Sequence, residues 1–151
     1  MKNIIKFIDK YNNVPQVVYN ALLKCVNSPE HPIYHPEGTL ETHIDIVVSR
    51  CFERDSKELH FAGLLHDVLN HGICKELWGD ERKGKIKEHL KGDYYQNVFH
   101  AEHAVKLIEL PEVTEWIESH NVDVSVVKTI VGEHMRMKNY LSGEKGKKGG
   151  M

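Results

Sequence analysis

LHFAGLLHD, residues 59–67, is an apolar run that ends in an adjacent histidine and aspartate. Its apolar side chains recur at helical spacing, which predicts a buried helix over residues 57–67 that begins after Asp55 or Ser56. The pair His66-Asp67 stands at the end of that helix, where an imidazole and a carboxylate can bind the same divalent cation. This donor set suits manganese, iron, cobalt, nickel or zinc better than calcium.

Apolar residues at helical spacing predict helices along most of the chain, and neither an internal repeat nor an alternation of period two is evident. The further predicted helices run from Ile4 to Tyr11, from Pro15 to Cys25, from a cap at Thr39 or Thr42 to Cys51, from Val98 to Leu110, from Pro111 through Ile117, and from a cap at Asp123 or Ser125 to Met137. A short helix is also expected around Lys83–Leu90, inside a polar segment that spans residues 72–97. The fold class is therefore all-α, a single bundle of about six or seven helices.

The composition describes an ordinary globular chain of 151 residues with 40% hydrophobic and 28% charged residues. We expect one domain over residues 1–140 and a disordered glycine- and lysine-rich tail over residues 141–151. The formal net charge of −2 gives no broad basic field for nucleic acid.

The three cysteines lack the paired spacing of a zinc ribbon or a redox motif, so we expect reduced thiols, two of them in the core. No apolar run approaches the roughly 18 residues that span a bilayer. Charged residues also interrupt the N-terminal segment too early for a signal peptide. A cytoplasmic protein without a membrane partner is expected.

Eleven histidines are more than a domain of this size usually carries. Four of them, His43, His66, His100 and His134, fall on or beside the apolar faces of four different predicted helices. A helix bundle builds metal sites by directing such side chains at a shared interior point, and Asp67 would join them there. The alternative is that each is a hydrogen-bonded histidine of the core or its boundary.

The four candidate histidines and Asp67 lie in four motifs, which read HPEGTLETH (35–43), LHFAGLLHD (59–67), VFHAEHA (98–104) and IVGEHM (130–135). In order and spacing they resemble the HD superfamily of metal-dependent phosphohydrolases, most closely the HD domain of bacterial CCA-adding tRNA nucleotidyltransferases. The resemblance covers roughly residues 35–137. It implies an HD-domain bundle that binds one or two divalent transition-metal ions. His43, His66 and Asp67 would hold the main ion, and Asp67 would bridge to a second ion held by His100 and His134.

Two positions depart from the family pattern. Asn70 stands where many members have a lysine that meets phosphate, and no aspartate follows His134, where the family supplies a last ligand. Either the chain is cut short, another ligand substitutes, or the metal site is weakened. Water, the substrate or a residue of a neighbouring subunit could fill that place, and the last of these would require a homo-oligomer.

We expect substrate contacts from residues that follow the second and the fourth of these motifs. Arg136 and Lys138 follow His134 and are candidates for holding phosphate, with Asn70 as a hydrogen-bond donor. The alternative for the two cations is a solvated helix end that the helix dipole favours. His103 shares a helix face with His100 and is a candidate catalytic proton donor, or else a surface histidine. The segment 72–97 is expected to act as a mobile lid.

The function that the resemblance implies is hydrolysis of a phosphate ester by a phosphomonoesterase, phosphodiesterase or nucleotidase. Its substrate would be a nucleotide or a terminal nucleic-acid phosphate, with Asp67 as the central catalytic residue. The alternative is a degenerate HD module that binds a nucleotide or a protein partner without turnover. A third interpretation, a di-iron oxygenase, is open to relatives of this fold, but no residue here demands redox chemistry.

Overall fold

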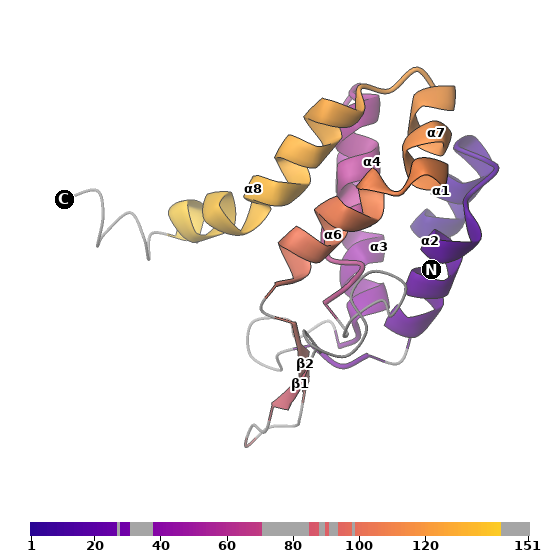
Figure 1. Ribbon diagram of the computed structural model, residues 1–151. Helices are drawn as coiled ribbons and strands as arrows, with labels where there is room; N and C mark the ends of the chain where they lie inside the picture. The colour runs from indigo at the N-terminus through magenta and orange to yellow at the C-terminus, as the bar shows by residue number, and fades with distance from the viewer. Residues whose placement is uncertain are drawn as a thin grey trace.

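The computed structural model describes residues 1–26, 28–30, 38–70, 85–87, 90, 94–97 and 99–142, with the main chain alone over 85–87, 94–96 and 135–142. Within these ranges it contains seven α-helices and two short β-strands (Figure 1). The elements are α1 (Lys2–Lys10), α2 (Gln16–Cys25), α3 (Leu40–Cys51), α4 (Lys57–Leu65), β1 (Lys85–Lys87), β2 (Tyr94–Gln96), α6 (His100–Glu109), α7 (Pro111–Ser119) and α8 (Val124–Ser142). The predicted all-α bundle is confirmed.

Side-chain caps fix the starts of three helices and decide between the residues that the sequence left open. Thr39 Oγ1 accepts a hydrogen bond from the Thr42 amide at the start of α3. Ser56 Oγ accepts from Leu59 N at the start of α4, and Asp123 Oδ1 accepts from Ser125 N at the start of α8. Each bond satisfies an amide that lacks a partner within its own helix.

Helix α4 lies at the centre of the bundle, packed against α3 on one side and α8 on the other (Figure 1). Helix α6 packs along α8, and α1 packs along α3. Helix α4 is buried over His60–Leu65 and ends at Leu65, so His66 and Asp67 directly follow a buried helix. The elements that carry the four predicted histidine ligands are therefore neighbours.

Aromatic rings from three helices pack together in the core. Phe7 and Phe61 are fully buried, with ring centroids 5.1 Å apart, and Trp116 packs on Phe61 at 5.0 Å. The indole Nε1 donates to the main-chain oxygen of Asn12 at 3.0 Å, which satisfies its one polar group. The predicted burial of Cys25 and Cys51 is confirmed, whereas Cys74 lies outside the described residues.

Gly63 allows α3 and α4 to approach closely. A Cβ atom at this position would lie 2.6 Å from the Sγ atom of Cys51, well inside van der Waals contact. The glycine thus sets the spacing between the helix that carries His43 and the helix that leads to His66.

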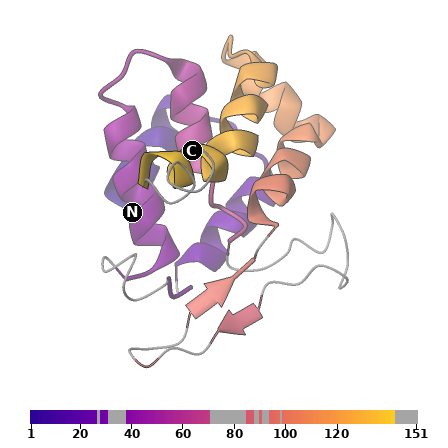
Figure 2. The ribbon, with the colours of Figure 1, turned by 90° about the vertical axis from the view of Figure 1, so that its left-hand side faces the viewer.

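The short helix expected around Lys83–Leu90 is wrong, because β1 and β2 pair there as an antiparallel ladder with Ile86 opposite Tyr95. The two strands lie at the end of the bundle where α6 begins (Figure 2). Isoleucine and tyrosine favour strands. Strand β2 lies several residues after β1 in the sequence, so the spacing of apolar residues within one helical turn does not indicate that the two segments pair.

Several predictions fall on other parts of the chain. Most of the expected lid, including residues 72–84, 88–89 and 91–93, lies outside the described residues, as do residues 143–151 of the expected tail. Residues 141 and 142, which the prediction assigned to the tail, belong to α8. Among the described helices, none combines the length and apolar character needed to cross a membrane.

Candidate metal centre

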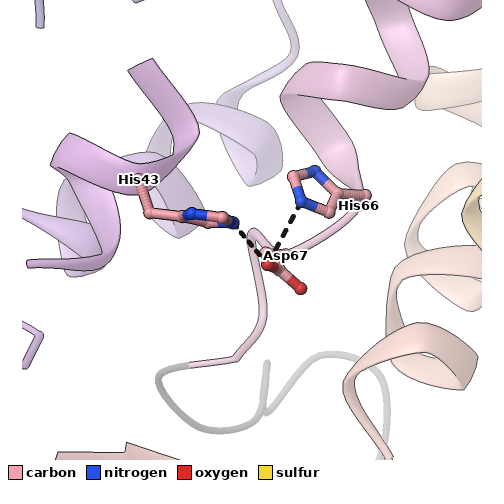
Figure 3. A group of neighbouring side chains, drawn as sticks. All are labelled: His43, His66 and Asp67. Carbon is pink, nitrogen blue, oxygen red and sulfur yellow. Dashed lines mark hydrogen bonds and ion pairs between the residues drawn. The ribbon is translucent and has the colours of Figure 1, made fainter. Parts of the chain in front are cut away.

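Four elements bring their histidines to one carboxylate. His43 lies in α3, His66 directly follows α4, His100 is the first residue of α6, and His134 lies in α8. Figure 3 shows the side chains of His43, in α3, and of His66, just after α4, pointing toward Asp67. The structure therefore brings together all five residues that the sequence predicted as metal ligands.

Each oxygen of Asp67 faces one pair of imidazoles. Oδ2 lies 3.0 Å from His43 Nε2 and 3.1 Å from His66 Nε2. Oδ1 lies 3.0 Å from His100 Nε2 and 3.2 Å from His134 Nε2. These atoms form two possible ligand groups, His43–His66–Asp67 and Asp67–His100–His134, in each of which all atoms lie within 4.8 Å of one another. The carboxylate is thus shared between two halves of one cluster.

Main-chain carbonyls fix the orientation of three of the rings. His66 Nδ1 lies 2.8 Å from the oxygen of Gly63, His100 Nδ1 lies 2.9 Å from that of Asn97, and His134 Nδ1 lies 2.6 Å from that of Val131. A carbonyl oxygen only accepts, so each Nδ1 donates its proton. In the neutral ring Nε2 is then a lone pair, directed at the carboxylate.

This arrangement is the donor set that a divalent cation requires. Neutral imidazole nitrogens and carboxylate oxygens that converge without protons between them repel one another, unless an added proton or a metal ion lies among them. In known metal sites, a ligating histidine usually donates its other ring N–H to a carbonyl or a carboxylate, which fixes the orientation of the ring. The bonds from Nδ1 to main-chain carbonyls here are of this kind. Asp67 with His43, His66, His100 and His134 could therefore hold a metal ion, and these donors fit manganese, iron, cobalt, nickel or zinc.

The electrostatics keep Asp67 ionised although only 5% of the residue is exposed. Burial acts to raise the pKa of Asp67. When the ring nitrogens that face Asp67 carry protons, the charge of His66 and the hydrogen bonds of His100, His134 and His43 outweigh burial and hold that pKa well below its usual range. For His100, burial acts to lower the pKa, but the hydrogen bond and charge of Asp67 raise it overall. A buried carboxylate in this state needs positive charge beside it.

The predicted substrate residues are placed only in part. Asn70 is half-buried. Its Nδ2 donates to Glu30 Oε2 and its Oδ1 accepts from Asn97 N, both at 3.4 Å. Arg136 and Lys138 continue α8 after His134, but their side chains lie outside the described part of the chain. Their role in holding phosphate therefore stays a prediction.

The expectation that His103 could be a surface histidine is wrong, because the residue is fully buried. It follows His100 by three residues in α6, so it shares the inner face of that helix. Its Nδ1 lies 2.7 Å from the amide nitrogen of Asn97. His103 belongs to neither of the two ligand groups found among the described residues, and its catalytic role stays a prediction.

Two buried polar residues beside the cluster were missed from the sequence. Asn97 and Glu30 are 1% and 6% exposed. Asn97 accepts a bond from Phe99 N through its own side chain, a turn typical of asparagine just before a helix, and this signal could have identified it. Glu30 follows a proline in a loop, and no local pattern distinguishes it. Comparison with protein-family models, curated proteins and solved structures gives no match for this chain.

Proposed function

We propose that this protein is a metal-dependent phosphohydrolase that acts on a nucleotide or on a terminal nucleic-acid phosphate. The observation that carries the proposal is the position of Asp67, whose two oxygens each face a pair of imidazoles from separate elements. The order of the motifs around these residues, which resembles that of HD-superfamily phosphohydrolases, supports the same function.

In this proposal the residues of the cluster divide the work between charge and geometry. Asp67 is the shared anionic ligand, because each of its two oxygens faces a pair of imidazole nitrogens. The carbonyls behind His66, His100 and His134 fix which ring nitrogen faces inward. A divalent cation, when bound, supplies Lewis-acid charge that favours ionisation of water and offsets the charge that builds on phosphoryl oxygens.

The substrate would bind beside the cluster. We assign phosphate contacts to Arg136 and Lys138, which follow His134 by two and four residues in α8. Asn70 is the proposed hydrogen-bond donor from the Asp67 side. These assignments make phosphate the group held nearest the histidines.

A binding module without turnover is the second candidate, and one observation favours it. The Asn70 amide, at the position where many HD proteins have a lysine, already donates to Glu30. In this alternative the cluster would hold a cation and a nucleotide, and phosphate release would be absent.

One experiment separates the two candidates. Purified protein is first analysed for bound metal, then loaded with Mn²⁺ and screened against nucleoside mono-, di- and triphosphates, cyclic nucleotides and 3′- or 5′-phosphorylated oligonucleotides. The proposal predicts phosphate release that Asp67→Ala abolishes. Nucleotide binding without phosphate release would favour the binding module. If the protein showed no nucleotide binding and no phosphate release, both candidate functions would be excluded.

A further inference from the structure

Asn97 is a buried hydrogen-bonding residue between the segment that follows Asp67 and the start of α6. Its Oδ1 accepts from Phe99 N at 3.0 Å. Its Nδ2 donates to the main-chain oxygen of Leu69 at 3.0 Å and lies 2.7 Å from His103 Nδ1. Because Oδ1 is already an acceptor, the amide nitrogen supplies both of the other bonds, so His103 Nδ1 accepts.

The main chain of Asn97 contacts the cluster directly. Its carbonyl oxygen accepts from the His100 ring at Nδ1, 2.9 Å away, and from His100 N at 3.0 Å. The other two carbonyls with this role, those of Gly63 and Val131, belong to helices α4 and α8. The carbonyl of Asn97 lies before α6 begins, outside regular secondary structure. Its direction depends on what else holds residue 97.

We propose that Asn97 is a positioning residue, whose side chain holds its own carbonyl so that His100 presents Nε2 to Asp67 Oδ1. The inference rests on the metal centre of the proposed function. Leu69 is two residues from Asp67, and His103 is one turn from His100. By bonding to both, the side chain ties together the two segments whose contact, at 3.0 Å, forms one half of the cluster.

The first test is Mn²⁺ binding by the full chain, wild type and Asn97→Ala, measured by calorimetry and by electron paramagnetic resonance. Loss of an outer partner of a metal-ligating histidine weakens affinity by about 10- to 100-fold. We expect a loss of this size for the cation held by His100 and His134, with binding by His43 and His66 retained. A folded Asn97→Ala variant with the wild-type affinity and stoichiometry would overturn the proposal.

Two further variants keep the test decisive. Asn97→Ser retains an acceptor for Phe99 N but cannot reach Leu69 or His103, so it should be affected less than Asn97→Ala. If the alanine variant fails to fold, weaker binding by the serine variant supports the proposal, and unchanged binding contradicts it. Tyr11→Phe is the matched control, since it removes a buried hydrogen bond to His60 and contacts none of the five cluster residues. It should leave Mn²⁺ binding unchanged.

The second measurement needs no metal. Long-range proton–nitrogen spectra of the chelator-treated protein report whether the His100 Nδ1 proton is protected from exchange. We expect protection in the wild type and its loss in Asn97→Ala, while the His66 Nδ1 proton, bound to Gly63, stays protected in both. Equal protection of His100 in both proteins would overturn the proposal. If the wild type binds no Mn²⁺ but Asn97→Ala still loses protection of the His100 Nδ1 proton, the metal centre is refuted and the positioning role of Asn97 is retained.

Discussion

The Nε2 atoms of His100 and His134 lie 3.1 Å apart, although the Nδ1 atom of each ring donates to a main-chain carbonyl. Two ring nitrogens of this kind cannot donate to each other, and both also face Asp67 Oδ1. A positive charge among the three atoms removes the conflict. A metal ion can do so at neutral pH with both rings neutral, which is why we interpret the contact as one half of a metal centre.

His100→Ala and His43→Ala test whether both halves of the centre are needed. Because each Asp67 oxygen faces its own histidine pair, we expect cations on both sides and a similar loss of phosphate release in the two variants. Removing a direct ligand should weaken cation binding by more than the roughly 10–100-fold typical of an outer partner. Metal content and phosphate release are measured together. Wild-type release by His100→Ala would instead mean that a single cation, held by His43 and His66, is sufficient.

Chelation should destabilise the protein. A ligand that binds only the folded state, present at 100 times its dissociation constant, stabilises it by about 2.7 kcal/mol, or roughly 5–10 °C in Tm for a chain of this size. We therefore expect Tm to fall when bound metal is removed with EDTA and to recover on adding Mn²⁺ or Zn²⁺. Differential scanning calorimetry measures both steps. An Asp67→Ala protein should show neither, and equal shifts in that variant would count against the site.

Gly63→Ala should push α3 and α4 apart. The added methyl would meet Cys51 Sγ at 2.6 Å, and such overpacking costs about 1–3 kcal/mol in the free energy of unfolding. The double variant with Cys51→Ala should recover much of the loss, as urea unfolding would show.

Gly132→Ala is the control for that substitution, because its methyl would meet Val105 at an ordinary 3.5 Å. In a helix interior this change should stabilise by up to about 1 kcal/mol. Equal losses at the two glycines would contradict the close approach at Gly63.

Asp45 caps a helix other than its own. Its Oδ1 accepts from the Asn3 and Ile4 amides at the start of α1, both at 2.8 Å. Asp45→Asn should lower the free energy of unfolding by about 1–2 kcal/mol at pH 7, because a charged acceptor is lost. Asp55→Asn, at an exposed position, should change it little.

The effect of Asp45 should depend on pH. Burial acts to raise the pKa of Asp45, but the bonds from Ile4 and Asn3 and the chain's amino group lower it overall. A carboxyl with a lowered folded-state pKa stabilises above its unfolded pKa of about 3.9 and loses that contribution as pH falls through the folded value. The difference in the free energy of unfolding between wild type and Asp45→Asn should therefore be largest at neutral pH and disappear below about pH 4. A gap that persists at low pH would exclude an ionic cap.

Local sequence was sufficient for most of the fold, because apolar spacing and capping residues act within one or two helical turns. Pro111 begins α7 and Asp123 caps α8 as these rules predict. The strand pair was not predictable in this way. Pairing of Ile86 with Tyr95 joins residues that no helical or local strand period connects.

The candidate site shows the same division. The five ligand residues could be named because three lie on or beside the apolar side of a predicted helix, His66 and Asp67 end an apolar helical run, and the motif order resembles a known family. His103 shares a helix face with His100, and this spacing was sufficient to predict that His103 is buried, although the sequence alone left a surface position open. Asn97 acts through Leu69 and His103, contacts that only the packed chain creates.

We propose above that Asp67 and its four histidines hold a divalent cation. The most direct test is equilibrium dialysis of the wild type and Asp67→Ala against Mn²⁺, followed by elemental analysis, with circular dichroism to verify the helical content. We predict stoichiometric binding by the wild type and none by the variant, with similar helical signals, because the carboxylate serves the cluster and not the apolar core. A wild type that binds no transition metal, or an Asp67→Ala variant that binds as tightly, would contradict the account.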